Sequence, residues 1–127
     1  MSRFVIPETH TLTLANGDRL VVWVRLNAGQ ARARNARMYT TASDGTRLLN
    51  LLEIGRATVL AFLVDWTLAD EDIPIRGLPT DDVATILDRL APEDFYEIRD
   101  AIDEHEAEQQ ARRAAEKKTT LIGASTS

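Results

Sequence analysis

Residues 47–66 read RLLNLLEIGRATVLAFLVDW and form the most apolar segment of the chain. If this segment is helical, apolar side chains cover more than half of the helix circumference. Such a helix has to be buried on several sides or lie in an interface, so we expect residues 47–66 to be the core helix of the domain. Gly55 costs a helix about 1 kcal/mol relative to alanine, which favours a close crossing with another helix at this position.

Residues 9–26 predict a β-hairpin ahead of this helix. The alternating stretch Thr11–Leu14 is followed by the turn dipeptide Asn16-Gly17 and then by an apolar, β-branched run from Leu20 to Leu26. The Asn-Gly pair suits the two positive-φ positions of a type I′ turn. Because a two-stranded hairpin is marginally stable alone, this one has to pack on the helices or gain strands from another molecule.

Local signals predict three further helices. They span residues 28–39, 80–90 and 92–111 or beyond. Asn27 and Gln30 predict a capping box at the start of the first of them. Thr80 is the expected N-cap of the second, and Pro92 is the expected first residue of the third. Residues 40–46 are rich in turn-forming side chains and predict a loop.

These elements predict an α+β fold, mainly α, with an N-terminal β-hairpin followed by about four helices. A chain of 127 residues can bury one modest core. We expect residues 1–111 to form a single small domain. Residues 112–127 are expected to be a charged helix end followed by a flexible, disordered tail from residue 119.

Charge is distributed unevenly along the chain. Residues 1–64 carry eight arginines against four acids, a net charge of +4, whereas residues 65–127 carry seven bases against sixteen acids, a net charge of −9. The acidic total argues against general nucleic-acid binding, which needs a cationic surface. The two halves either aid solubility and docking within the chain or form two faces for different partners. Arg32, Arg34 and Arg37 are expected to lie on a solvated helix face.

The sequence offers no pattern typical of catalysis or metal binding. Cysteine is absent, which excludes thiolate chemistry and is typical of a reducing cytoplasm. His105 lacks the second histidine that a zinc-binding helix needs four residues later, so we expect a solvated histidine flanked by acids. Asp70-Glu71-Asp72 lacks the glycine and the glutamate of a calcium loop. We therefore expect a protein that is not an enzyme, has no cofactor and does not enter a membrane.

Six short motifs, spread over most of residues 4–110, resemble one protein family in their order along the chain. They are Pro7-Glu8, Asn16-Gly17-Asp18, Val64-Asp65-Trp66, Asp70-Glu71-Asp72, Leu78-Pro79-Thr80 and Leu90-Ala91-Pro92. This arrangement resembles the small tail assembly chaperones of long-tailed, siphovirus-like bacteriophages and prophages. Members of that family often carry glycine directly after the acidic triplet, where this chain has Ile73 and reaches a glycine only at Gly77.

The resemblance implies a role in viral morphogenesis in the cytoplasm of the bacterial host. Such chaperones bind the long, largely helical tape-measure protein and keep it soluble until tail-tube subunits polymerise around it. The implied partners are the tape-measure protein first, then the tail tube protein and further copies of this chain. The residues expected to contact a partner are Leu52, Val59, Phe62, Trp66, Asp70, Glu71 and Asp72.

Two other functions are compatible with the same residues. A structural minor tail or head–tail connector protein would add its hairpin to a neighbour's sheet and remain in the virion. A small DNA-binding regulator would use the arginines of residues 28–39 and bind duplex DNA with a steep salt dependence. The apolar surface of residues 47–66 is either a partner-binding surface or ordinary core within the chain.

Overall fold

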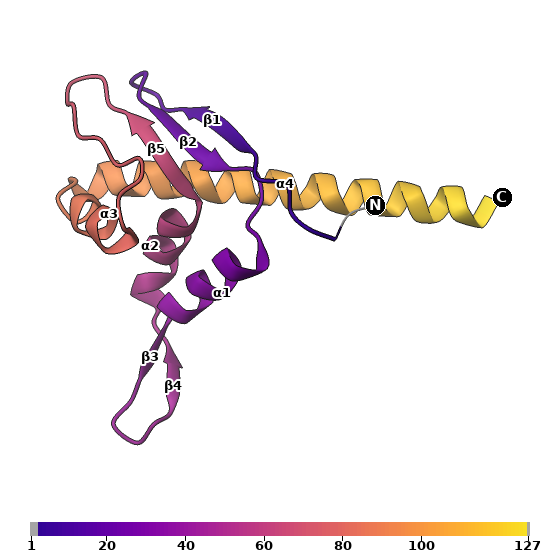
Figure 1. Cartoon of the computed structure of the whole chain (residues 1–127), viewed down its shortest axis with the longest axis horizontal. Coiled ribbons are helices and arrows are strands. Elements are labelled where there is room, and N and C mark those ends of the chain that lie inside the picture. Colours follow the sequence, from indigo (N-terminus) through magenta and orange to yellow (C-terminus); the bar gives the residue numbers. More distant parts are fainter. Residues whose placement is uncertain (1–2, 127) are drawn as a thin grey trace.

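Within residues 3–126, the fold consists of a three-stranded antiparallel sheet, a projecting two-stranded hairpin and four helices (Figure 1). The computed structural model describes these residues, with side chains as far as Lys117. In chain order the elements are β1 (Thr9–Thr13), β2 (Arg19–Trp23), α1 (Ala28–Arg37), β3 (Tyr39–Thr41), β4 (Arg47–Leu49), α2 (Leu51–Phe62), β5 (Leu63–Thr67), α3 (Thr80–Leu87) and α4 (Pro92–Thr126). The expected class, α+β and mainly α with an N-terminal hairpin, is confirmed.

The N-terminal hairpin is formed by β1 and β2, but its turn differs from the prediction. The Gly17 N–H donates a hydrogen bond to the Leu14 carbonyl oxygen at 3.0 Å, and within this turn Gly17 alone has a positive φ, of 91°. The loop is therefore a three-residue type I turn closed by a glycine bulge, and the expected type I′ turn is wrong. The Asn16 side chain instead accepts a hydrogen bond from the Asp18 N–H at 3.0 Å.

The end of the expected core helix is a strand. Helix α2 stops at Phe62, and Leu63 already has extended dihedral angles, with φ −73° and ψ 121°. Strand β5 pairs with β2 and completes the sheet order β1-β2-β5, with a register shift that leaves Val64 as the extra residue of a bulge. The bulge turns both Leu63 and Trp66 towards the core. The chain forms a strand here because β2 would otherwise leave an open edge beside the apolar core.

The expected loop at residues 40–46 and the first residues of the expected core helix form a second hairpin, β3–β4. Its turn repeats the geometry of the first turn. Gly45 has a φ of 88°, and the Asp44 carboxylate accepts a hydrogen bond from the Thr46 N–H at 3.0 Å. Hydrogen bonds from the backbone and side chain of Thr46 stabilise the charged form and lower the pKa of Asp44.

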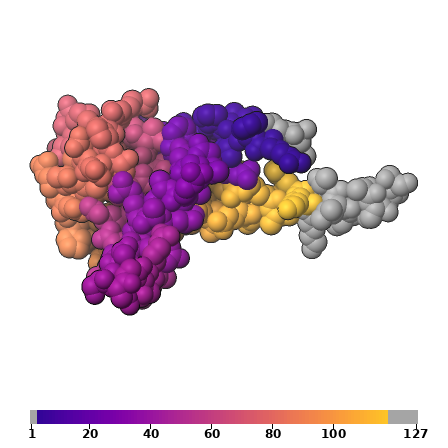
Figure 2. All heavy atoms as spheres, turned by 60° about the horizontal axis from the view of Figure 1, so that its bottom comes forward, coloured from indigo at the N-terminus to yellow at the C-terminus, as the bar shows by residue number. Residues whose placement is uncertain are grey.

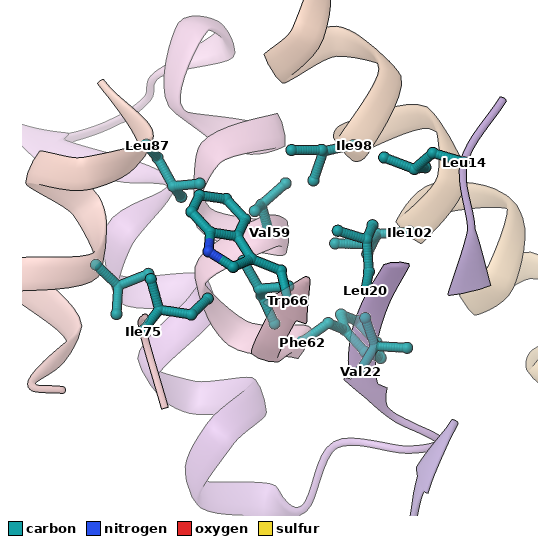
Figure 3. Packing of buried hydrophobic residues seen from close by; sticks show 12 residues of the cluster. Leu14, Leu20, Val22, Val59, Phe62, Trp66, Ile75, Leu87, Ile98 and Ile102 are labelled. Atoms are coloured by element: carbon teal, nitrogen blue, oxygen red, sulfur yellow. The ribbon is translucent and has the colours of Figure 1, made fainter. Parts of the chain in front are cut away.

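One hydrophobic core connects the sheet with α2, α3 and α4 (Figure 3). Its buried side chains are Leu14, Leu20, Val22, Val59, Phe62, Leu63, Trp66, Ile75, Val83, Leu87, Ile98 and Ile102. The Trp66 indole N–H donates to the Ile73 carbonyl oxygen at 2.6 Å, which satisfies the buried donor and fixes the segment that follows β5.

Two local predictions about the helices are confirmed. The capping box of α1 is present, with the Gln30 N–H donating to Asn27 Oδ1 at 2.8 Å and the Asn27 N–H donating to Gln30 Oε1 at 2.9 Å. Gly55 marks a close helix crossing, because a Cβ atom at this position would lie 2.6 Å from Cδ of Arg99 on α4. The absence of a side chain at Gly55 therefore lets α2 and α4 approach each other.

The N-cap and the end of α3 differ from the predicted ones, whereas α4 begins at Pro92 and continues past residue 111, as predicted. Pro79, not Thr80, is the N-cap of α3 and supplies no side-chain hydrogen bond, because Thr80 is already helical. Helix α3 ends at Leu87 instead of residue 90. The backbone of α4 is helical from Pro92 to Thr126, well beyond residue 111. The expected disordered tail, residues 119–127, lies outside the residues whose side chains are described.

Candidate protein-binding surface

The residues expected to contact a partner do not form one surface. Val59, Phe62 and Trp66 are core residues with exposed fractions of 0%, 2% and 6%, so a partner cannot reach them while the domain is folded. Leu52, at the start of α2, is 90% exposed. The acids Asp70–Asp72 are exposed on the segment between β5 and α3, which lies on the other side of the molecule from β3–β4 (Figure 1).

The acidic segment between β5 and α3, residues 68–79, is held against the sheet. The Ala69 N–H donates to the Asp18 carboxylate at 2.7 Å, and Arg76 pairs with Asp65 of β5 at 3.1 Å. A hollow of about 500 Å³ lies beside the first half of this segment. Among the described residues, no three His, Cys, Asp or Glu side chains come together in a group that could hold a metal ion.

His105 is buried, and the expectation of a solvated histidine is wrong. Its side chain is 3% exposed, and its Nε2 lies 2.9 Å from the carbonyl oxygen of Trp23. The ring stacks on His10 with 5.7 Å between centroids and meets the Phe62 ring edge-on at 6.0 Å. His105 follows Ile102 by three residues on α4, so it occupies the apolar stripe of the helix despite its acidic neighbours.

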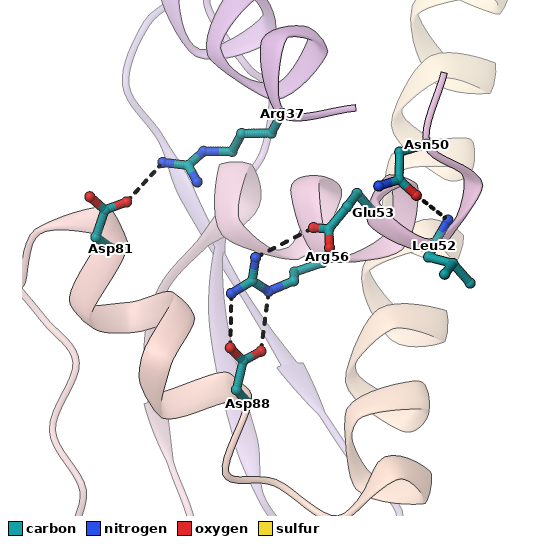
Figure 4. Close-up of polar contacts among 7 residues, drawn as sticks. All are labelled: Arg37, Asn50, Leu52, Glu53, Arg56, Asp81 and Asp88. Atoms are coloured by element: carbon teal, nitrogen blue, oxygen red, sulfur yellow. Dashed lines mark hydrogen bonds and ion pairs between the residues drawn. The ribbon is translucent and has the colours of Figure 1, made fainter. Parts of the chain in front are cut away.

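The arginines of α1 do not form the solvated face that was expected. Arg34 Nη1 lies 2.6 Å from a carboxylate oxygen of Glu106 on α4, and the two side chains are only 19% and 23% exposed. Arg37 lies 3.6 Å from Asp81 of α3 (Figure 4). Arg32 is exposed. Two of the three charges therefore serve contacts between helices, which weakens the case for a nucleic-acid patch.

An exposed apolar surface lies on β3–β4 and the first turn of α2. It is named here the leucine arm and consists of Tyr39, Leu48, Leu49, Leu51 and Leu52, with exposed fractions of 42%, 52%, 49%, 75% and 90%. Every residue of β3 and β4 is exposed. The hairpin projects from the body of the molecule, away from the three-stranded sheet and from α4 (Figures 1 and 2). Large apolar side chains that are exposed close together in the chain of a small domain are typical of an interaction site.

The leucine arm is attached to the body by hydrogen bonds at its base. The Asn50 N–H donates to the Met38 carbonyl oxygen at 2.7 Å, which continues the hairpin pairing to the end of α1. The Asn50 side chain then accepts a hydrogen bond from the Leu52 N–H at 3.1 Å and caps α2 (Figure 4). The arm is thus a positioned surface with a defined direction.

An ion-pair cluster behind the arm holds α2 against α3. Arg56 makes two hydrogen bonds to Asp88, at 3.0 Å and 3.2 Å, and lies 3.4 Å from Glu53 (Figure 4). Burial alone would lower the pKa of Arg56, but the hydrogen bonds and charges of Asp88 and Glu53 outweigh it and raise that pKa. The planar guanidinium and the carboxylate fit each other as a fork, which fixes the angle between the helices.

The two hairpins have the same turn geometry but differ in burial. The first hairpin contributes leucine and valine side chains to the core, whereas β3–β4 contributes none of its described residues. The Asp44-Gly45 dipeptide between two short β-prone runs is a hairpin signal equal to Asn16-Gly17, and it could have identified this element. The exposure of Leu48, Leu49 and Leu51 could not be read from the sequence.

Within the described part of the chain, no helix is both long enough and apolar enough to span a lipid bilayer. Comparison of the chain with protein-family models, with curated proteins and with solved structures finds no match. The function therefore has to be inferred from the surfaces of the molecule, of which the leucine arm is the most distinctive.

Proposed function

We propose that this protein is a non-enzymatic tail assembly chaperone that binds a phage tape-measure protein through the leucine arm in the host cytoplasm. The observation that carries the proposal is the arm: five large apolar side chains exposed together on a projecting element of fixed direction. A surface of this kind suits the apolar face of an amphipathic helix. The six sequence motifs that resemble tail assembly chaperones supply the class of client, a long and largely helical protein.

The charge distribution of the chain supports a role in keeping a client soluble. Residues 65–127 carry a net charge of −9, and the acids of the segment after β5 and of the start of α4 are exposed. A net charge far from zero opposes aggregation of a complex. The leucine arm, residues 39–52, contains one acid, Asp44, and one base, Arg47, so its net charge is zero. Its contact with a client is therefore governed by apolar burial more than by charge.

Co-expression with the tape-measure protein encoded in the same gene cluster tests the proposal. We expect the wild-type chain to raise the soluble fraction of the client several-fold and to co-purify with it. Leu52→Glu should abolish both effects, because it places a charge in the apolar contact. This change should not unfold the chaperone, since a glutamate in the first turn of α2 faces the favourable end of the helix dipole.

Ile6→Glu is the matched control, because Ile6 is 77% exposed but lies outside the leucine arm. It should leave co-purification unchanged. If the wild-type chain neither co-purifies with the client nor changes its solubility, the proposed function is wrong. If Leu52→Glu binds the client as the wild type does, the assignment of the arm is wrong.

A structural minor tail or head–tail connector protein is the alternative that one observation favours. Hairpin β3–β4 forms a sheet of only two strands, so both of its edges can extend the sheet of a neighbouring subunit. Mass spectrometry of purified virions separates the two functions. A chaperone should be absent from finished particles, whereas a connector should be present in a fixed copy number.

A further inference from the structure

We infer that a second copy of this chain covers the leucine arm when no client is bound, in an isologous dimer formed arm to arm. The occupant is therefore the protein itself, and the inference goes beyond client binding. A client that binds the arm should displace the second copy. This consequence rests on the proposed function, whereas the dimer itself does not.

The exposed area of the arm matches what a dimer needs. Its five apolar side chains expose an area on the order of 500 Å², at the upper end of the patches that monomeric proteins carry. A stable interface buries about 800 Å² on each partner, of which roughly 60% is apolar. Exposed polar neighbours on β3, Thr40 and Thr41, can supply part of the remaining rim. Two arms together thus form an interface of ordinary size and composition.

The charge distribution favours the arm as the contact between two acidic molecules. Two copies that each carry a net charge of −5 repel each other, and the repulsion is smallest where the local charge is lowest. The arm hairpin carries one acid, Asp44, and one base, Arg47. Asp44 is bound within its own turn, and the Arg47 guanidinium lies 4.9 Å from the centroid of the Tyr39 ring. An arm-to-arm contact also keeps the two α4 helices apart, because the hairpin projects away from α4 (Figure 1).

The shape of the arm suits a two-fold contact. Tyr39 pairs with Leu49 across the hairpin, so these two side chains share one face, while Leu48 lies on the other face. Leu51 and Leu52 form a second apolar surface at the start of α2, directly after the hairpin. In an isologous dimer the hairpin of each copy can pack on the helix start of the other, so that one contact occurs twice.

Sedimentation velocity of the purified full chain tests the dimer. We expect the wild type at about 50 µM to sediment with twice the monomer mass of 14.1 kDa. Leu52→Glu should sediment as a monomer with an unchanged circular dichroism spectrum, and Ile6→Glu should remain a dimer. A monomeric wild type, or a Leu52→Glu variant that still forms the dimer, would overturn the inference.

Cysteine cross-linking locates the interface independently, because the chain has no cysteine of its own. Leu49→Cys and Leu51→Cys, combined in one chain, should give a covalent dimer under mild oxidation, whereas Ile6→Cys should stay monomeric on a non-reducing gel. Cross-linking of Ile6→Cys alone would place the contact elsewhere and overturn the arm-to-arm geometry.

The outcomes for the dimer and for the proposed function can be told apart. If the wild type is monomeric but still solubilises the client, the dimer is wrong and the chaperone function stands. If the wild type dimerises through the arm but never binds the client, the chaperone function is wrong and the dimer stands. If the dimer and the chaperone function are both correct, added client should convert the dimer into a complex in which each binding site on the client holds one leucine arm.

Discussion

Gly17 and Gly45 occupy the same position in the two hairpin turns, with φ values of 91° and 88°. A residue with a side chain is disfavoured in this left-handed region by about 1–2 kcal/mol. We expect Gly17→Ala and Gly45→Ala each to lower the free energy of unfolding by about 1 kcal/mol, measured by urea denaturation. Gly29→Ala is the control within α1 and should be neutral or stabilising, since its Cβ would make an ordinary 3.5 Å contact. Equal effects at all three glycines would contradict the turn assignments.

Asp103 on α4 provides a test that depends on pH. The residue is exposed, but partial desolvation of the carboxyl group raises its pKa above the usual 3.8; Arg99 opposes this effect, and the neighbouring acids Asp100 and Glu106 add to it. Because the folded state then disfavours the charged carboxylate, the stability associated with Asp103 is present below pH 3.8 and is lost as the pH rises through the raised pKa. Asp103→Asn should therefore increase the free energy of unfolding at pH 7 but not at pH 3, as measured by urea denaturation.

Glu104→Gln is the matched control for Asp103→Asn, because Glu104 is the neighbouring acid on the same turn of α4 and both residues are exposed. It removes one negative charge from the same helix and leaves the partly desolvated carboxylate of Asp103 in place. Both variants lower the overall acidity equally, so a general charge effect would stabilise them equally at pH 7. Equal stabilisation of both variants would refute a specific role of desolvation at Asp103.

At the scale of elements, β5 shows why the sequence predicted a helix where the chain forms a strand. Leu63 and Trp66 are three residues apart and both buried, which is the spacing of one helix face. The bulge at Val64 produces the same spacing in a strand, because it adds one residue to the two-residue period. The local pattern is therefore compatible with both elements. Only pairing with β2, distant in the sequence, decides between them.

The candidate site was only partly predictable for a related reason. Apolar residues cover more than half of the circumference of residues 51–62, so the sequence indicates burial on several sides without saying which side stays open. Val59 and Phe62 belong to the core, whereas Leu52 is 90% exposed and lies outside the core cluster. Leu52 was expected among the partner contacts. The four other arm residues were not, because their exposure depends on the direction in which β3–β4 projects, and tertiary packing sets that direction.

Arg34 and Glu106 connect α1 to α4, two elements far apart in the sequence. Removing one partner of this half-buried pair leaves the other charge without compensation, so we expect Arg34→Ala to lower the free energy of unfolding by about 1–3 kcal/mol. Replacing both, as Arg34→Met with Glu106→Leu, should restore most of the loss. Chemical denaturation of the wild type, Arg34→Met, Glu106→Leu and the double replacement gives a double-mutant cycle. Arg32→Ala, at an exposed position, should change stability by less than about 0.5 kcal/mol.

A double replacement that is as unstable as Arg34→Ala would show that the pair is not the source of the effect. The Arg34 Nε atom is buried and has no hydrogen-bond partner among the described residues, so an apolar side chain at this position also removes a desolvation cost. The connection between α1 and α4 is therefore expected to tolerate apolar replacement better than loss of one charge.

At the scale of the whole molecule, the proposed function places client binding and solubility in different parts. The leucine arm projects on one side of the body, and α4 runs along the molecule and extends beyond it (Figure 1). The core contacts of α4 end near His105, and Arg113 is still half buried. The fold and the arm should therefore depend on the first part of α4 and not on the residues after Lys117.

Truncation of α4 tests this division. A chain that ends after Lys117 should keep its free energy of unfolding within about 0.5 kcal/mol of the full chain, because it retains every described core contact. It should also sediment like the full chain, since the arm lies on another part of the molecule. A chain that ends after Glu104 loses the buried His105 and the Arg34–Glu106 pair, and we expect it to be less stable by about 3 kcal/mol or more. Thermal and urea unfolding followed by circular dichroism measure both changes. If the chain ending after Lys117 unfolds as readily as the shorter one, the end of α4 takes part in the fold, and the separation of binding arm from acidic helix is wrong.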